Sequence, residues 1–220
     1  MTGRGSALAV PRHEGEAAAA GPGLAVDTAD AAPASMRRFR CLNPFHFEQG
    51  RNIPVPGTDR FACSVESVWQ GLKLVDGVTD PDMLRLPARK RPPESLRTGD
   101  YDYSASLFCF GGRTVDLVTA RYLIYLPTYL HLLDRLVPDA VVGEVHDALD
   151  RGRSVYFYDW DANFDIEDDR DSFSHSAVLA AWFGGSLERE LRRRAHWLGR
   201  HGIRDGPPLD VDRYRRLHSR

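Results

Sequence analysis

The stretch that most constrains the fold reads Ser64-Val65-Glu66-Ser67-Val68-Trp69-Gln70-Gly71-Leu72-Lys73. Its apolar side chains recur at the i, i+3, i+4, i+7 spacing of one buried helix face, namely Val65, Val68, Trp69 and Leu72. Its polar side chains recur at i, i+4, i+7 on another face, namely Glu66, Gln70 and Lys73. The spacing therefore predicts a short helix with one packing face and one polar face.

The start of this helix affects the chemistry of its polar face. Ser64 precedes the apolar run and has the residue type of an N-cap, which places Glu66 in the first turn. A carboxylate near the partly positive end of the helix dipole tends to stay ionised. The polar face is then either an ordinary solvated surface or one wall of a ligand site. Trp69 lies on the apolar stripe, and we expect it to be a core residue rather than a stacking platform.

Outward from this helix, the pattern predicts a small α+β domain over 38–187, with several helices around a short sheet. Strand composition occurs at 106–110 and 154–158. Helical patterns run over 114–125, from a break at Pro127 to 136, from Pro138 to about 151, and from Ser174 or Ser176 onward.

The two ends differ from this domain in composition. Residues 1–37 are rich in Ala, Gly and Pro and have no aromatic residue, so we expect a disordered tail, and the functional polypeptide is expected to start at Met1 or Met36. Residues 188–220 contain ten Arg against five acidic residues and are expected to form a basic C-terminal extension. The interspersed acids favour a solvated helix there over a nucleic-acid-binding surface.

Overall composition narrows the protein class. A net charge of −2 does not indicate a nucleic-acid-binding fold. The three cysteines show no C-x-x-C spacing, so a disulfide framework or zinc ribbon is not expected. The chain also lacks the roughly 18 consecutive apolar residues of a membrane span. These features predict a cytoplasmic protein with no membrane partner.

One motif resembles a known family. Phe61, Ser64, Val65, Glu66, Trp69, Gln70 and Lys73 are similar, in order, to the NADAR signature of an aromatic residue followed by a Ser/Thr-Val-Glu-x-x-aromatic-Gln-x-x-Lys helix. Asn43-Pro44-Phe45 resembles that family's Asn/Ser-Pro-Phe segment. The second half lacks the family's Asp-x-x-Trp-Gly and Gly-x-Asn-x-Leu-Gly motifs, so the chain resembles a divergent relative. The resemblance implies an α+β N-glycosidase or ADP-ribose-processing hydrolase, with Asn43 and Phe45 among the substrate-binding residues.

The chemistry of such a reaction points to carboxylates. Breaking a C–N glycosidic bond passes through an oxocarbenium-like state, which one carboxylate stabilises while a second acid group assists departure of the base. Glu66 is the first candidate, and the second is Asp159 or Asp161, where a predicted strand runs into a loop. Lys73, or an Arg between 85 and 97, is a candidate for holding a phosphate. Trp69 and Trp160 are candidates for stacking on a base.

The acidic loop over 159–171 contains seven acids and one Arg. Asp161, Asn163 and Asp165 occupy positions 1, 3 and 5 of a calcium loop, but Ile166 stands where an EF-hand needs Gly, so an EF-hand is excluded. A looser Mg²⁺ or Ca²⁺ site that uses Asp159, Asp161, Asp165 and His175 is an alternative to a solvated loop. His175 is either a general acid/base or a neighbour of a helix cap, and the second interpretation is favoured.

The sequence thus predicts an N-glycosidic hydrolase for a ribosyl, phosphoribosyl or ADP-ribosyl compound, without a cofactor or a metal. Glu66, Asp159 and Asp161 are the candidate catalytic residues. The candidate substrate-binding residues are Asn43, Phe45, Trp69, Gln70, Lys73, Trp160, Asn163, Asp165 and His175. The expected partner is a small ribosylated substrate, with nucleic acid only as a modified substrate. The alternatives are a non-catalytic nucleotide-binding or ADP-ribose-binding module and an acidic-loop metal protein.

Overall fold

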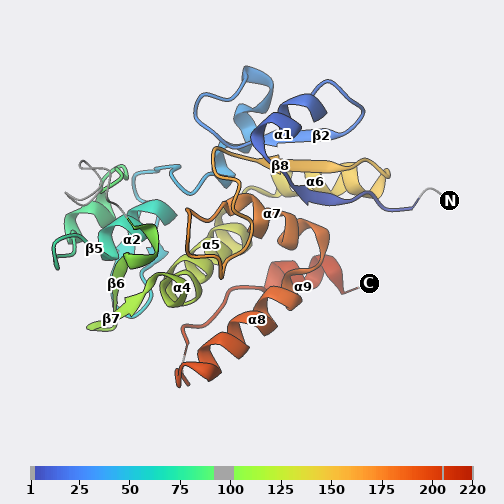
Figure 1. Ribbon diagram of the computed structural model, residues 1–220. Helices are drawn as coiled ribbons and strands as arrows, with labels where there is room; N and C mark the ends of the chain where they lie inside the picture. The colour runs from blue at the N-terminus through green and yellow to red at the C-terminus, as the bar shows by residue number, and fades with distance from the viewer. Residues whose placement is uncertain (1–2, 92–101, 205, 220) are drawn as a thin grey trace.

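The fold is mixed α+β, as predicted. A computed structural model describes residues 3–91, 102–204 and 206–219. Within these residues, helices surround three small sheets, of which one is parallel and two are antiparallel (Figure 1). No described helix combines the length and the apolar character needed to cross a membrane.

The parallel sheet joins distant parts of the chain in the order β1-β8-β2. Its strands are β1 (Ala7–Ala9), β2 (Leu24–Asp27) and β8 (Val155–Tyr158). Successive side chains of β8 face opposite sides. The ring of Phe157 stacks on Phe183 of α7 (His175–Gly184), whereas Tyr158 contacts Gly15 of α1 (Arg12–Ala18). Consequently α1 and α7 lie on opposite sides of this sheet (Figure 1).

The prediction of a disordered tail over 1–37 is wrong for the described residues from 3 onward. This segment forms β1, α1 and β2, and Val26 in β2 is fully buried. Its small residues reflect close packing, because a Cβ added at Gly15 would lie only 2.0 Å from Cδ1 of Tyr158. The segment lacks apolar bulk of its own, and β8 supplies the missing partner surface.

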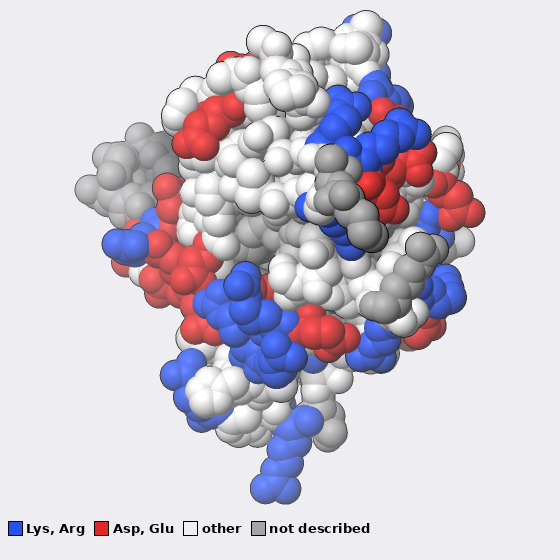
Figure 2. All heavy atoms as spheres, turned by 90° about the vertical axis from the view of Figure 1, so that its right-hand side faces the viewer, with Lys and Arg blue, Asp and Glu red and all other residues white. Residues whose placement is uncertain are grey.

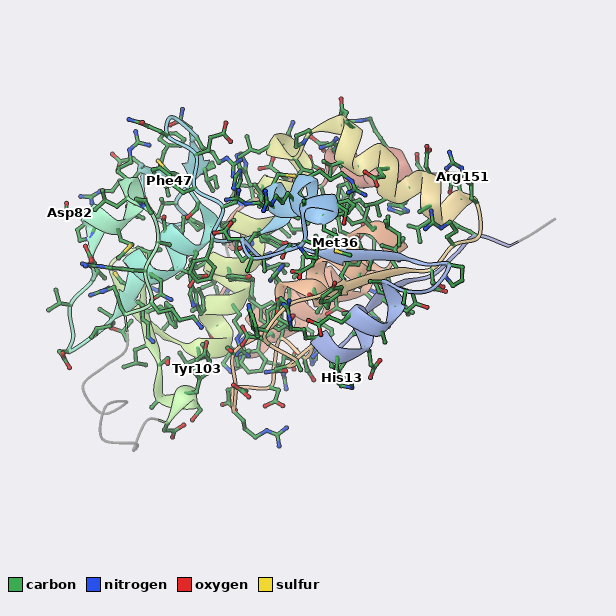
Figure 3. All side chains as sticks on the ribbon, turned by 90° about the horizontal axis from the view of Figure 1, so that it is seen from above. His13, Met36, Phe47, Asp82, Tyr103 and Arg151 are labelled. Carbon is green, nitrogen blue, oxygen red and sulfur yellow. The ribbon has the colours of Figure 1, made fainter. Side chains whose placement is uncertain are left out.

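The domain boundary expected between residues 37 and 38 is also wrong. A 3₁₀ helix, η1 (Ala34–Leu42), runs across it. Met36, labelled in Figure 3, is partly buried and packs against the core, where the Tyr158 hydroxyl donates a hydrogen bond of 3.7 Å to the Met36 sulfur. Strands on both sides of this position belong to one sheet, so residues 3–37 are part of the domain.

The predicted two-faced helix is confirmed as α2 (Val65–Leu72), except that Lys73, predicted on its polar face, has extended backbone and begins a strand. Ser64 is its N-cap, and the Ser67 amide donates to Ser64 Oγ at 3.0 Å. Around α2 lie β3 (Ile53–Pro54), β4 (Phe61–Ala62), the 3₁₀ turn η2 (Pro81–Arg85), and the antiparallel sheet of β5 (Lys73–Leu74), β6 (Leu107–Phe110) and β7 (Arg113–Asp116). The predicted strand at 106–110 is thus confirmed as β6, which follows a short 3₁₀ turn, η3 (Tyr103–Ala105).

A long helical rod crosses the middle of the molecule and differs from the prediction in two ways. It consists of α4 (Leu117–Ala120), η4 (Arg121–Tyr125), α5 (Leu126–His131) and η5 (Leu132–Leu136). It begins after β7 rather than at residue 114, and it continues through Pro127 without a break. The turn η4 before Pro127 is π-helical, so the regular i→i−4 hydrogen-bond pattern already changes there and a residue without an N–H is accommodated.

The remaining helices close the core. Pro138 precedes α6 (Asp139–Asp150), and Ser174 caps α7, as predicted. Residues 188–220 are not a detached extension, because α8 (Leu187–Arg200) and α9 (Asp212–His218) bury Leu198 and Tyr214 in the core. Several of their arginines pair with acids, as Arg193 does with Asp165 at 2.6 Å. On the face drawn in Figure 2, which is the right-hand side of Figure 1, basic and acidic side chains are likewise interspersed.

Candidate active site

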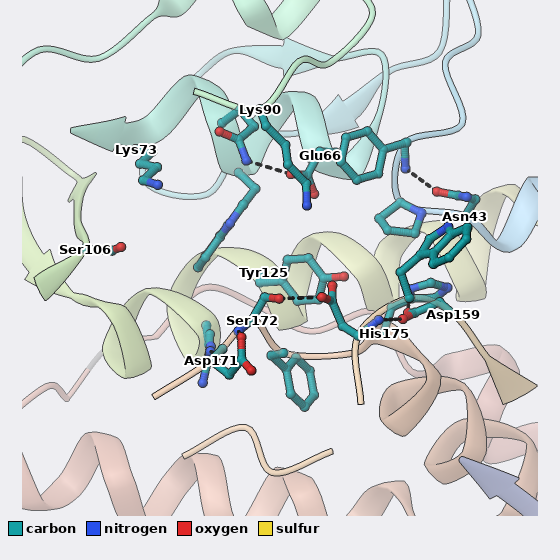
Figure 4. A pocket seen from close by; sticks show the side chains of 18 of the residues that line it. Asn43, Glu66, Lys73, Lys90, Ser106, Tyr125, Asp159, Asp171, Ser172 and His175 are labelled. Carbon is teal, nitrogen blue, oxygen red and sulfur yellow. Dashed lines mark hydrogen bonds and ion pairs between the residues drawn. The ribbon is translucent and has the colours of Figure 1, made fainter. Parts of the chain in front are cut away.

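A cavity of about 440 Å³ lies between α2 and the carboxyl ends of β2 and β8. This volume suits a small organic ligand. Three segments converge on it: the polar face of α2, residues 43–45, and the acidic loop with the start of α7 (Figure 4). Ten of the predicted site residues line it, namely Asn43, Phe45, Glu66, Trp69, Gln70, Lys73, Asp159, Trp160, Asp161 and His175.

The first wall is the polar face of α2. Glu66 and Gln70 are each only 6% exposed, so the alternative of a solvated helix surface is wrong for them. Gln70 Nε2 donates to Glu66 Oε1 at 2.7 Å, while Gln70 Oε1 accepts from the Arg91 amide at 3.1 Å. Burial raises the pKa of Glu66, although Gln70 and the charge of Lys90 partly oppose that shift. The position of Glu66 near a helix N-terminus predicts an ionised carboxylate, but its burial has the larger effect and favours the protonated form.

Residues 43–45 connect this wall to the opposite one. Asn43 Nδ2 donates to the Thr28 carbonyl at 2.8 Å, and Asn43 Oδ1 accepts from the Phe45 amide at 2.7 Å. The Pro44 carbonyl accepts from the Glu66 amide at 2.9 Å. Asn43 and Pro44 together therefore connect the backbone of one wall, at Thr28, to that of the other, at Glu66.

The second wall contains a series of buried polar groups. His175 Nδ1 lies 2.6 Å from Asp159 Oδ2, and His175 Nε2 lies 2.7 Å from Thr28 Oγ1. Burial alone would raise the pKa of Asp159, but the neighbouring His175 and three hydrogen bonds bring that pKa below its ordinary value. Asp159 is thus the ionised carboxylate of this wall. Sequence reasoning missed Thr28, because it lies in the segment predicted to be disordered.

Asp161 faces the cavity from the loop that follows β8. Its Oδ1 accepts a hydrogen bond of 2.5 Å from Ser172 Oγ. Burial raises the pKa of Asp161, the charge of Asp159 adds to that increase, and Ser172 and Lys90 oppose it. The charge of Asp161 in turn raises the pKa of Glu66. The two carboxyl groups are therefore electrostatically coupled and both retain protons more readily than exposed acids.

Aromatic side chains form much of the cavity surface. Trp69 is a core residue, as predicted, and its ring centroid lies 4.0 Å from that of Phe108 and 5.5 Å from that of Tyr125. Trp69 also lines the cavity, so its ring can pack in the core and contact a bound ligand at the same time. Trp160 is 75% exposed at the cavity mouth, and the Arg12 guanidinium lies 4.2 Å from its ring centroid.

Cationic groups lie on the same cavity. Lys73, Lys90, Arg91 and Arg121 line it, and sequence reasoning named only Lys73 individually. Arg91 Nη1 donates to the carbonyls of Gln70 and Lys73, so this guanidinium holds its own segment against the C-terminal end of α2. Lys90 is exposed and influences the pKa of Glu66. The predicted phosphate-binding arginines beyond residue 91 lie outside the described residues.

Asn163 and Asp165 are not brought to the cavity. Asn163 Nδ2 donates to the Asp168 carbonyl at 2.9 Å, and Asp165 pairs with Arg193 of α8. Arg121 braces the same loop by donating to the carbonyls of Asp168 and Asp171, each at 2.6 Å. The loop is thus held by bonds from both sides. Among the described residues, no group of three or more His, Cys, Asp and Glu side chains is placed to hold a metal ion.

Comparison with known proteins places the chain in a family. Residues 17–179 match DUF6939, a family of unknown function, and the chain belongs to it. The matched region includes β2, α2, β8 and the start of α7, and hence both walls of the cavity. No curated protein and no solved structure matches the chain significantly.

Proposed function

We propose that the protein hydrolyses an N-glycosidic bond of a ribosyl, phosphoribosyl or ADP-ribosyl compound, as its resemblance to NADAR enzymes implies. The main support is the placement of two coupled carboxyl groups, Glu66 and Asp161, on one cavity with aromatic walls. An oxocarbenium-like transition state needs an acid for the leaving base and a carboxylate for the sugar and the attacking water.

Differences between the environments of the two carboxyl groups support a division of these roles. Glu66 is the more deeply buried, so protonated Glu66 donates its proton to the departing nitrogen. Asp161 is less buried, and the hydrogen bond from the Ser172 hydroxyl opposes the rise of its pKa. In its ionised form Asp161 accepts a proton from the water that attacks the anomeric carbon. The C–N bond breaks, the new C–O bond forms, and a later proton exchange with solvent restores both groups. Asp159 also lines the cavity, but its carboxylate is bonded to His175, and we assign it no step in this reaction.

The rest of the cavity provides recognition for such a substrate. Trp69, Phe108 and Tyr125 offer flat apolar surface for a base. Lys90 offers a cation for a phosphate at the exposed edge. A bound substrate would use the aromatic, carboxyl and cationic lining groups together. Its base would contact the aromatic rings, its ribose would lie beside the carboxyl groups, and its phosphate would lie near Lys90.

The test is incubation of the purified protein with ADP-ribosylated nucleobases and with ribosylamino pyrimidine phosphates, with products identified by mass spectrometry. Glu66→Gln and Asp161→Asn should each lower turnover by about 10² to 10⁴-fold, the range for loss of a general acid or base. Asp169→Asn is the matched control, because Asp169 is exposed in the same loop and does not line the cavity.

The result also separates catalysis from binding. If folded wild-type protein forms no product from either class, the hydrolase assignment is wrong. Saturable binding by calorimetry without turnover, retained in Glu66→Gln, would instead identify a nucleotide or ADP-ribose binding module.

A further inference from the structure

The polar series on the second wall follows from the register of the parallel sheet. Asp27 of β2 is paired with Tyr158 of β8, so the next residues, Thr28 and Asp159, leave adjacent strands side by side. Side chains alternate along a strand. Tyr158 faces α1 and Phe157 faces α7, so Asp159, one residue further on, is directed toward α7 again. The start of α7 places His175 between Asp159 and Thr28.

The hydrogen bonds define the direction of this series. Asp159 also accepts from the Asp161 amide at 2.5 Å and from Ser174 Oγ at 3.0 Å, which fixes its carboxylate. A fixed carboxylate beside His175 Nδ1 favours the tautomer with the proton on that nitrogen. His175 Nε2 is then an acceptor, and the Thr28 hydroxyl donates to it. This is the arrangement of a hydroxyl nucleophile, a base and a group that orients the base.

We propose that Thr28, His175 and Asp159 form a second chemical centre on the cavity wall, in which Thr28 is a nucleophile toward carboxylic esters with an aromatic part. Thr28 is 1% exposed and lines the cavity, so a ligand bound inside the cavity lies next to it. Tyr125, Phe45 and Phe173 line the same space and suit an aromatic ester. This activity does not depend on the proposed glycosidic reaction.

The step balances without another reactant. Thr28 Oγ1 forms a bond to the ester carbonyl carbon while its proton passes to His175 Nε2. The carbon–oxygen bond to the alcohol breaks, and the alcohol leaves with the proton from His175. Water then attacks the threonine ester and gives a proton to His175, which returns it to Thr28 Oγ1 as the carboxylic acid departs. Asp159 acts through His175 as a positioning residue.

The first measurement is covalent labelling with a small fluorophosphonate, read by intact mass and peptide mapping. Attack of the Thr28 oxygen on phosphorus releases fluoride and leaves a stable adduct. We expect one adduct at Thr28, its retention in Thr28→Ser, and a labelling rate at least about 100-fold lower in Thr28→Val and His175→Gln. Thr128→Val is the matched control, because Thr128 is equally buried but bonds to the Ile124 carbonyl and does not line the cavity.

A second measurement tests whether His175 activates the Thr28 hydroxyl or whether their hydrogen bond only stabilises the fold. Wild-type protein should hydrolyse 4-nitrophenyl acetate, and turnover should fall at least about 100-fold in Thr28→Val and in His175→Gln but be retained in Thr28→Ser. A purely structural role predicts lower thermal stability in these variants with no adduct in the wild type. Wild-type protein that is folded but unlabelled at Thr28 overturns the proposal.

The two proposals fail separately, because the labelling needs no ribosyl substrate. An adduct at Thr28 without glycosidic turnover would support the proposal of a Thr28 nucleophile and contradict the proposal of a glycosidase. Glycosidic turnover without an adduct would do the reverse.

Discussion

The two walls of the cavity are built in different ways. The α2 wall takes its polar groups from one helical turn, where Glu66 and Gln70 are four residues apart and bond to each other. The opposite wall takes Thr28, Asp159 and His175 from three segments, brought together by a parallel sheet and a helix start. The α2 wall is therefore a local product of sequence, whereas the opposite wall exists only when the whole fold forms.

The largest expected effect tests this dependence by removing one segment. A chain that starts at Met36 would lack β1 and β2, leaving both edges of β8 unpaired and Phe157 partly uncovered. We expect this chain to lose cooperative thermal unfolding altogether, because three-stranded pairing supports the centre of the domain. Circular dichroism during heating measures this. A matched deletion of residues 1–3, which precede β1, should unfold like the full chain; a cooperative transition in the Met36 chain would contradict the structure.

This difference also explains what could be predicted from the sequence. The 3.6-residue period and the Ser64 cap identified α2 and three cavity residues, because all of that information lies within one helix. Asp159 and Asp161 were identified from the end of a strand. Thr28 gave no local signal, since its segment lacks bulk and depends on β8 for burial. Pro127 was misinterpreted for a related reason: the surrounding π-helical turns, set by tertiary packing, accommodate it.

The next prediction compares the same chemical change on the two walls. Glu66→Gln replaces a carboxyl group whose ionisation burial disfavours with a neutral amide, so we expect the free energy of unfolding at pH 7 to stay equal or rise by up to about 1 kcal/mol. Asp159→Asn removes a charge that His175 and its other partners favour, and we expect a loss of about 2 kcal/mol. Urea denaturation followed by tryptophan fluorescence measures both. Equal losses in the two variants would show that the walls do not differ electrostatically.

The stability changes of Glu66→Gln and Asp159→Asn should also depend differently on pH between 7 and 5. The raised pKa of Glu66 destabilises the fold only where the carboxyl group would ionise, so any advantage of Glu66→Gln shrinks as pH falls toward 4.5, its ordinary pKa. The lowered pKa of Asp159 stabilises the fold above 3.8, and this contribution disappears only as pH falls below that value. The deficit of Asp159→Asn should therefore persist at pH 5. Urea midpoints at pH 7, 6 and 5 provide the comparison, with Asp169→Asn as the exposed control.

The smallest expected effect concerns Lys90, which is at the exposed edge of the α2 wall and belongs to neither hydrogen-bonded series. If Lys90 holds a phosphate, Lys90→Gln should weaken ADP-ribose binding by about 3 to 10-fold, as expected for one solvent-screened ion pair. Lys90→Arg should retain the affinity, and added salt should narrow the gap between wild type and Lys90→Gln. Arg89→Gln is the neighbouring control, because Arg89 is exposed and does not line the cavity. Calorimetry at two salt concentrations measures all four proteins. Equal weakening in Arg89→Gln would indicate long-range electrostatic attraction rather than a direct contact between Lys90 and the phosphate. Unchanged binding in Lys90→Gln would place the phosphate away from the α2 wall.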